Sequence, residues 1–340
     1  MKQNTVGSPG EQAGRYVLVF AMACICFAAV LVSVNYFTDR YYIFHGQDGE
    51  FLETLEPNSR VLKARYLKEH CGEFDAIVMG SSRDVGYLTR DVNRTFGVNS
   101  YNYGVAAGNL RGIRARLQWL ASKSCLPARI FIPISIDKLR LPERPDDLLR
   151  KEHPDIVGNR AYHREFLLSY IGTDAFISNV RKLLRHLRTR NEPKFRYNIS
   201  TGDVYYLWDR SFEIEACAAV PDDPGDAIIR QYAEFLLSIK SLAEQNHATV
   251  TLLWNPQTVN LQWVYVDQAR ALFDKLSGEF TAIYRLPPSD ERLRDSSFHH
   301  DRGHFKPELG AAVIASPDNQ VKLDSLLSEL EAAAAVCRQR

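Results

Sequence analysis

The stretch Phe74-Asp75-Ala76-Ile77-Val78-Met79-Gly80-Ser81-Ser82-Arg83 decides the fold class of this chain. Its apolar residues do not alternate with polar ones, which is typical of a strand covered on both faces, and Gly-Ser-Ser marks a turn. Further strand-like runs occur at 98–104, 130–136, 248–254 and 282–286, and helical spacing occurs at 110–123, 228–245, 263–276 and 307–314. This alternation predicts an α/β fold with a doubly wound, mostly parallel sheet in a three-layer, flavodoxin-like arrangement.

An uncharged apolar run from Val17 to Val34 is just long enough to cross a bilayer as one helix. Lys2 and Arg15 precede it and aromatic residues follow it, which favours a cytoplasmic start. A cleaved signal peptide is the alternative, but its apolar core would be shorter and the small residues of a cleavage site are poorly placed. We therefore predict a cytoplasmic tail (1–16), a transmembrane anchor (17–35), a stem (36–70) and an extracytoplasmic domain (71–340) with a helical insertion (138–225). Within the insertion we expect helices at 145–151 and 162–187, followed by a loop rich in aromatic residues.

The charge and cysteine content of the chain bear on its binding partners and on its cellular compartment. The chain has 340 residues, of which 45% are hydrophobic, and a net charge of +1 without a sustained basic stripe, so nucleic acid is not indicated. Cys71 and Cys125 each come just before a predicted strand, at the same edge of the sheet. In an oxidising compartment they could form a disulfide, and two buried free thiols are an equally good interpretation.

A second motif, Asp301-Arg302-Gly303-His304, follows the last predicted strand. A serine hydroxyl is a poor nucleophile until an imidazole takes its proton, and a carboxylate must hold that imidazole in the correct tautomer. Ser82, His304 and Asp301 supply these three groups. Only two residues separate Asp301 from His304, so we expect both on one helical-type turn. Loops after parallel strands meet at one edge of a sheet, so we expect the two motifs to lie close together. Ser82 as a simple helix N-cap is the alternative.

These motifs resemble those of the SGNH or GDSL hydrolase superfamily, in particular a membrane-anchored branch similar to the O-acyltransferases and esterases of exopolysaccharide and cell-envelope modification. Gly80-Ser81-Ser82-Arg83 is similar to its nucleophile block, Asn102-Tyr103-Gly104-Val105 to its second block, and Asp301-Arg-Gly-His304 to its final block. The resemblance implies an acyl-serine enzyme without a cofactor, in the periplasm and anchored in a bacterial inner membrane. It also implies a glycan or acylated small-molecule substrate and partners in polysaccharide assembly.

The oxyanion-binding groups match that family less well. Its second-block glycine corresponds to Gly108 or Ala107, and its third-block asparagine position falls on Ile136 or Asp137, neither of which donates like an amide. Ser82 at the start of a helix could contribute its own N–H. Asn109, Asn255 and Arg83 are the other candidate donors or substrate-binding residues.

Three alternatives stay open at this point. A catalytically silent, glycan-binding or assembly module of the same fold is the first, and the missing third-block asparagine supports it. A zinc site built from His299, His300, His304 and neighbouring aspartates is disfavoured, because adjacent histidines in a polar loop are usually solvated, and we predict no metal. A flavodoxin-like cofactor binder is disfavoured because no Gly-x-Gly-x-x-Gly turn follows the first strand.

Overall fold

A mostly parallel sheet forms the centre of the protein, as the sequence predicts. The computed structural model describes residues 9–135, 147–188, 192–214, 225–258 and 265–338. The strands of the central sheet are β2 (Ala76–Ser81), β3 (Ser100–Val105), β4 (Arg129–Ile134), β7 (Thr249–Trp254), β8 (Ile283–Tyr284) and β11 (Gln320–Val321). Their order is β11-β8-β7-β4-β2-β3, and only β11 is antiparallel to its neighbour. Numbered along the chain from β2, the five parallel strands have the 2-1-3-4-5 order of flavodoxin-like sheets. In this order the chain adds β3 on one side of β2 and the later strands on the other, so the switch point lies between β2 and β4.

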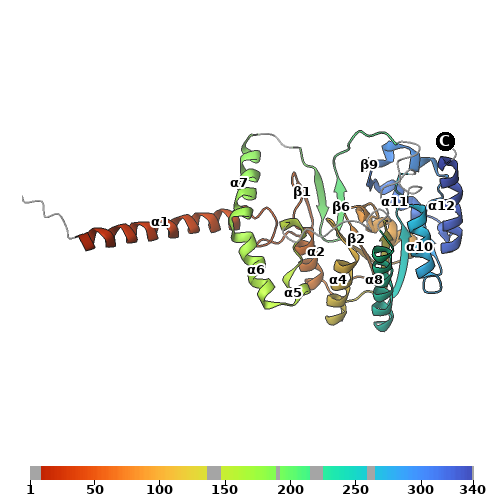
Figure 1. Cartoon of the computed structure of the whole chain (residues 1–340), viewed down its shortest axis with the longest axis horizontal. Helices are drawn as coiled ribbons and strands as arrows, with labels where there is room; N and C mark the ends of the chain where they lie inside the picture. The colour runs from red at the N-terminus through yellow and green to blue at the C-terminus, as the bar shows by residue number, and fades with distance from the viewer. Residues whose placement is uncertain (1–8, 136–146, 189–191, 215–224, 259–264, 339–340) are drawn as a thin grey trace, which may run out of the picture.

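Helices cover both faces of this sheet (Figure 1). One face packs on α2 (Ser59–Glu69), α4 (Leu110–Ser122), α8 (Asp226–Gln245), α10 (Val266–Leu276) and α12 (Leu323–Arg338), and the other packs on α3 (Thr89–Phe96) and α11 (Pro307–Ile314). Successive side chains of β2 enter the two cores in turn, Ile77 and Met79 on one side and Val78 on the other. Every residue of β2 is therefore buried, which explains its uninterrupted apolar sequence.

The predicted stem and insertion together build a smaller antiparallel sheet beside the central one. Its strands are β1 (Glu50–Glu53), β5 (Phe195–Asn198) and β6 (Asp203–Tyr206), in the order β1-β5-β6. The insertion also contains α5 (Pro154–Val157), α6 (Arg160–Ile171) and α7 (Thr173–Arg188). The stem is thus folded into the body through β1 and α2 and does not act as a spacer.

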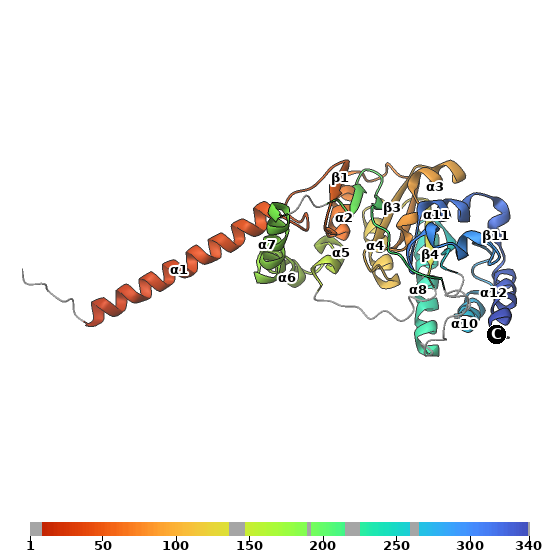
Figure 2. The ribbon, with the colours of Figure 1, turned by 90° about the horizontal axis from the view of Figure 1, so that it is seen from above.

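The N-terminal helix α1 (Pro9–Thr38) extends away from the body, and the last described residues of α12 lie at the opposite end (Figures 1 and 2). Residues 13–38 of this helix are long and apolar enough to span a membrane. The helix is longer than the predicted anchor at both ends, and its last turn contacts α7 and α6.

Several predicted elements differ in the structure. The single predicted helix 162–187 is divided at Gly172, whose backbone is extended, into α6 and α7. The helix predicted at 145–151 is a short 3-10 turn, Leu148–Arg150, and positions 145 and 146 lie outside the described residues. The helix α3 and the small antiparallel sheet were not predicted. Other 3-10 turns in the described part of the chain are Asp84–Gly86, Glu291–Arg294, Ser296–Phe298 and Pro317–Asn319.

Cys71 and Cys125 are joined by a disulfide, so of the two predicted alternatives the structure contains the disulfide and not a pair of free thiols. Their Cα atoms lie 5.2 Å apart, and the bond connects the segments that lead into β2 and β4. Cys24 and Cys26 are free and exposed on α1.

Candidate active site

The nucleophile candidate Ser82 directly follows β2, at the carboxyl edge of the sheet and beside the point where strand order reverses. The turn after the strand is fixed by Asp84, whose carboxylate accepts the Ser81 N–H. Ser81 itself is buried, and its Oγ accepts the Arg83 N–H at 3.3 Å. Of the two adjacent serines, only Ser82 therefore has its hydroxyl directed at the base.

The acid and base candidates lie on a small hairpin of β9 (His299–Asp301) and β10 (His304–Phe305). Asp301 and His304 are opposite each other across a tight turn, and not on the helical turn that the sequence suggested. Asp301 Oδ1 accepts the backbone N–H groups of Gly303 (2.8 Å) and His304 (2.9 Å). It also lies 2.8 Å from His304 Nδ1, so the carboxylate holds both the turn and the imidazole ring.

The two motifs meet as the sequence analysis predicts. His304 Nε2 lies 3.2 Å from Ser82 Oγ, within the range expected for a nucleophile and its general base. Because Asp301 accepts only, Nδ1 carries the proton and Nε2 is left to accept the serine proton. The three groups form a continuous relay from hydroxyl to imidazole to carboxylate.

The relay also sets the ionisation of Asp301. Partial burial by itself raises the pKa of the Asp301 carboxyl, but the hydrogen bond and charge of His304 and the two backbone N–H groups outweigh it. The pKa of Asp301 is therefore held well below its usual range. The carboxylate is therefore ionised near neutral pH, which is the state that can stabilise an imidazolium.

Close packing between the turn after Ser82 and the strand that carries His304 holds these two parts of the relay together. A Cβ on Gly86 would lie 2.5 Å from the Phe305 ring, and a Cβ on Gly310 would lie 2.3 Å from the Gly86 carbonyl oxygen. Both glycines are thus needed for close approach. The turn after Ser82 packs directly on the residue that follows His304, and Tyr87 adds an edge-on ring contact to Phe305 at 5.3 Å.

Tyr206, from the small sheet, closes one side of the relay. Its hydroxyl donates to the Ser82 carbonyl oxygen at 3.0 Å, and its ring lies edge-on to His304 at 5.4 Å between centroids. Sequence reasoning missed this residue. The available signal was the aromatic run Val204-Tyr205-Tyr206-Leu207-Trp208, which had been assigned to a loop.

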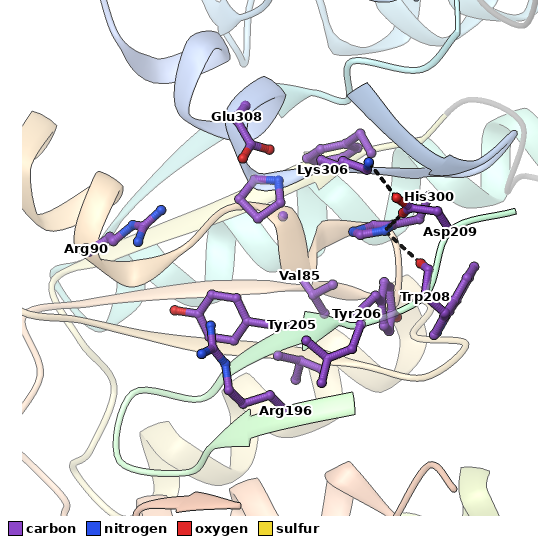
Figure 3. A pocket seen from close by; sticks show the side chains of 15 residues that line it. Val85, Arg90, Arg196, Tyr205, Tyr206, Trp208, Asp209, His300, Lys306 and Glu308 are labelled. Carbon is purple, nitrogen blue, oxygen red and sulfur yellow. Dashed lines mark hydrogen bonds and ion pairs between the residues drawn. The ribbon is translucent and has the colours of Figure 1, made fainter. Parts of the chain in front are cut away.

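A pocket of about 470 Å³ lies beside the relay (Figure 3). Its walls carry the aromatic side chains of Tyr205, Tyr206 and Trp208, from β6 and the residues after it, and of Phe305 from β10. Arg90, Arg196 and Lys306 supply positive charge, and Asp209 and Glu308 supply negative charge. Figure 3 also shows the dashed contacts that join Asp209 to Lys306 (2.8 Å) and to His300 (2.7 Å).

The expectation that His299 and His300 are solvated loop residues is wrong. Both are buried, at 2% and 7% exposure, because the hairpin β9–β10 packs them into the body. His300 Nδ1 is bound by Asp209 and the Trp208 carbonyl oxygen (3.0 Å). Burial lowers the pKa of His299 to about 4, so this ring is neutral at ordinary pH.

The predicted oxyanion donors differ in whether a hydrogen bond within the protein already uses them. The N–H of Gly108 donates to the Val105 carbonyl oxygen at 3.1 Å, so a turn already uses it. The loop nevertheless lies against the nucleophile turn, since a Cβ on Gly108 would be 2.2 Å from the Gly80 carbonyl oxygen. Among the residues that the structure describes, the Ala107 N–H makes no backbone hydrogen bond in a turn, loop or cap, which leaves it able to donate.

The other candidates have structural partners. The Asn109 side chain caps α4 by accepting the Gly112 N–H at 2.8 Å. Asn255 is buried, and its amide donates to Asp84 (2.5 Å) and to the Ser135 hydroxyl. Asn255 thus supports the nucleophile turn from the end of β7. The Arg83 guanidinium lies against Gly303, in the turn between Asp301 and His304.

One expectation about the carboxyl edge of the sheet is wrong, and another concerns residues that the structure does not describe. Ser82 does not begin an α-helix, because the residues after it form only the 3-10 turn Asp84–Gly86, so the dipole of a full helix is not added to its N–H. Ile136 and Asp137, at the third-block position, lie outside the described residues.

A buried ionic cluster binds the loop that follows β3 and contains Ala106 and Ala107. Arg60 donates to the carbonyl oxygens of Ala106 (2.8 Å) and Ala107 (3.1 Å) and to the carboxylate of Glu152 (3.2 Å). Arg116, which is completely buried, donates to the same carboxylate at 3.0 Å. Ala107 has a φ of +46°, a strained value for a residue with a Cβ, and the Arg60 contacts fix it.

Among the residues that the structure describes, no group of three or more His, Cys, Asp or Glu side chains is arranged to hold a metal ion. The absence of a metal and of a cofactor stays a prediction. Comparisons with known proteins identify no relative: no family model, no curated protein and no solved structure matches the chain significantly.

Proposed function

We propose that this protein is an SGNH-like acyl-transfer enzyme that works through an acyl-serine intermediate. The observation that carries the proposal is the relay in which His304 Nε2 lies 3.2 Å from Ser82 Oγ while Asp301 binds the opposite nitrogen of the ring. A serine with this support is activated for attack on a carbonyl carbon, whereas a serine that only caps a helix needs neither partner.

In the proposed reaction Ser82 Oγ attacks the acyl carbonyl carbon and His304 Nε2 takes the hydroxyl proton. Asp301 stabilises the imidazolium, and the Ala107 N–H is the candidate donor to the oxyanion, together with the Ser82 N–H that the sequence analysis predicts. The intermediate collapses when His304 returns the proton to the departing oxygen, which leaves the acyl group on Ser82. Water or a sugar hydroxyl then gives its proton to His304 and attacks the ester carbon, and His304 returns that proton to Ser82 Oγ as the acyl group leaves the serine.

The pocket beside the relay favours a carbohydrate as the acyl donor or acceptor. Tyr205, Tyr206 and Trp208 offer ring surfaces on which the C–H face of a sugar can pack, and the charged side chains can bind its polar substituents. Tyr206 contributes to this pocket and also contacts Ser82 and His304. Ser82 and His304 do not line the pocket themselves, so Tyr206 is the residue that would connect a sugar bound there to the relay.

We further propose that α1 anchors the enzyme in a bacterial inner membrane with residues after the anchor in the periplasm. The length and apolar character of α1 support the anchor. The disulfide between Cys71 and Cys125 supports an oxidising compartment for the body, because such bonds are rare in the cytosol.

A catalytically silent, glycan-binding module is the second candidate. The observations that favour it are the engagement of the Gly108 N–H and the Asn255 amide within the protein, which removes two predicted donors from the oxyanion site. In this case the pocket would still bind a glycan, and the relay would be inactive.

Ester hydrolysis by the purified full-length protein in detergent distinguishes the two candidates. With p-nitrophenyl acetate, we expect turnover by the wild type and a loss of roughly 10³-fold or more in Ser82→Ala. Ser81→Ala is the matched control, because the neighbouring hydroxyl has no contact with the imidazole, and it should keep turnover within a few-fold. Equal turnover in the wild type and Ser82→Ala would favour the silent module.

A further inference from the structure

The helices α6 and α7 form the end of the body from which α1 emerges (Figure 1). Both views show α7 crossing the end of α1, with its axis running across that of α1 (Figures 1 and 2). If α1 crosses a membrane along its own axis, α7 therefore runs along the plane of that membrane. No other described element lies between these two helices and the projecting part of α1 (Figure 2).

The depth of α7 is set by its contacts with α1. The apolar run of α1 ends at Val34, and the next residue, Asn35, donates to the Gly172 carbonyl oxygen at 3.0 Å and accepts from the Asn179 amide at 3.0 Å. Asn179 also accepts the Arg40 N–H at 3.0 Å. An α-helix needs about 20 residues to cross the hydrocarbon of a bilayer, so the run ends at the level of the headgroups, and α7 is held at that level.

The outward faces of both helices are apolar and exposed. In α7, Ile177 and Leu184 are seven residues apart on the side opposite the buried Ala175 and Asn179, and they are 49% and 43% exposed. In α6, Leu167 and Leu168 are both about half exposed, whereas Phe166 and Tyr170 on the other side are buried. Four large apolar side chains are thus exposed on two neighbouring helices, which is unusual for a protein surface that faces only water.

The charges around these leucines suit a bilayer surface. Arg160, Arg164 and Arg181 are exposed on the two helices. Two acidic side chains belong to these helices: Glu165 of α6 is paired with Lys151 at 2.9 Å, and Asp174 is exposed in the first turn of α7. An apolar face bordered by arginines is the composition of helices that lie in the interface of membranes with anionic lipids.

We propose that the α6–α7 hairpin lies in the headgroup region of the membrane that α1 spans, with Leu167, Leu168, Ile177 and Leu184 inserted toward the acyl chains. This inference rests on the anchor proposed above but not on acyl-transfer chemistry. The hairpin fixes the orientation of the body relative to the bilayer, so that the relay is held at a constant distance and direction from the lipid surface.

Lipid-dependent quenching of a fluorescent label tests the proposal. The full-length protein is reconstituted in phosphatidylcholine and phosphatidylglycerol vesicles, in a variant in which Cys24, Cys26, Cys217 and Cys337 are alanine and the disulfide is kept. Single cysteines for an NBD label are introduced as Leu184→Cys and Leu168→Cys in the hairpin. Phe20→Cys labels the anchor, and Ile228→Cys, an exposed apolar position on α8, is the matched control.

We expect lipids with a quencher on the acyl chain to quench the labels at positions 168 and 184 to an extent comparable with the label at position 20, and to leave position 228 unquenched. If position 20 is quenched and the two hairpin positions behave like 228, the hairpin proposal is overturned while the anchor stands. If position 20 is not quenched either, the anchor and the hairpin proposal both fall. Disulfide cross-linking between copies through Leu184→Cys without quenching would assign the face to a second copy and overturn the proposal. Ester hydrolysis by the same variants is measured separately, so that failure of the acyl-transfer proposal is distinguished.

Discussion

Asp301 performs two tasks with one carboxylate, since it fixes its own turn through two backbone N–H groups and orients the imidazole of His304. An asparagine at this position could still accept the backbone hydrogen bonds but would favour the wrong tautomer of the histidine. We therefore expect Asp301→Asn to fold normally and to lose roughly 10⁴-fold in turnover. Ester hydrolysis and thermal unfolding measure the two effects.

Asp209→Asn is the matched control, because Asp209 is bound to a neighbouring histidine, His300, at 2.7 Å but does not belong to the relay. It should reduce turnover far less than Asp301→Asn. A loss of the same size in both variants would mean that the relay has no special role.

His299 makes the stability of the protein depend on pH. Burial lowers the pKa of His299 to about 4, and its ordinary value is 6.5. Between these two values the unfolded chain binds a proton that the folded protein does not, so stability is present above pH 6.5 and is lost as the pH falls toward 4. The loss from this group is at most about 3 kcal/mol.

In His299→Leu this part of the pH dependence should be absent. Urea unfolding between pH 4 and pH 7 measures it, and the wild-type free energy of unfolding should fall more steeply with acid than that of the variant. The same slope in both proteins would show that His299 is not buried in its neutral form.

At the scale of the elements, the site depends on the contact between the 3-10 turn after Ser82 and the hairpin that carries His304. Gly86→Ala would place a Cβ 2.5 Å from the Phe305 ring and 3.1 Å from its carbonyl oxygen, so β10 must move. We expect a loss of about 1–3 kcal/mol in the free energy of unfolding together with a larger loss of turnover, because His304 adjoins Phe305. Urea unfolding and ester hydrolysis of the same preparation give both values.

Gly46→Ala provides the comparison for this variant, since its nearest neighbours are atoms of the flexible Arg65 side chain. It should change neither property appreciably. Turnover that survives in Gly86→Ala while stability falls would separate this packing contact from the function of the site.

The sequence was informative about elements where one physical pattern dominated. The uninterrupted apolar run of β2 and the Gly-Ser-Ser sequence predicted a buried strand followed by a turn that carries Ser82, and both the strand and the turn are present. The antiparallel strands β5 and β6 were missed because their side chains alternate less clearly and their partner β1 lies far away in the chain. Tyr206 was missed for the same reason.

Burial in the hairpin β9–β10 was not predictable from local sequence either. His299 and His300 are polar residues in a polar segment, and only the packing of the small sheet on this edge buries them. The relay residues, in contrast, were identifiable because a serine, an aspartate and a histidine at the carboxyl edge of a parallel sheet have few other reasons to meet.

At the scale of the whole molecule, the disulfide between Cys71 and Cys125 closes a loop with a sequence separation of 54. By the chain-entropy relation, cross-linking a loop of this length stabilises the folded state by about 4 kcal/mol. The double variant Cys71→Ala with Cys125→Ala should therefore unfold at lower urea concentration while its turnover below the transition stays near that of the wild type. A variant of unchanged stability would contradict this expectation.

The central claim is that His304 makes Ser82 nucleophilic, and covalent labelling with a fluorophosphonate probe, followed by mass spectrometry of the digested protein, tests it most directly. The account predicts an adduct on Ser82 in the wild type and a much slower reaction at the same serine in His304→Gln. A wild-type protein without an adduct on Ser82, or a His304→Gln variant that is labelled equally fast, would contradict it.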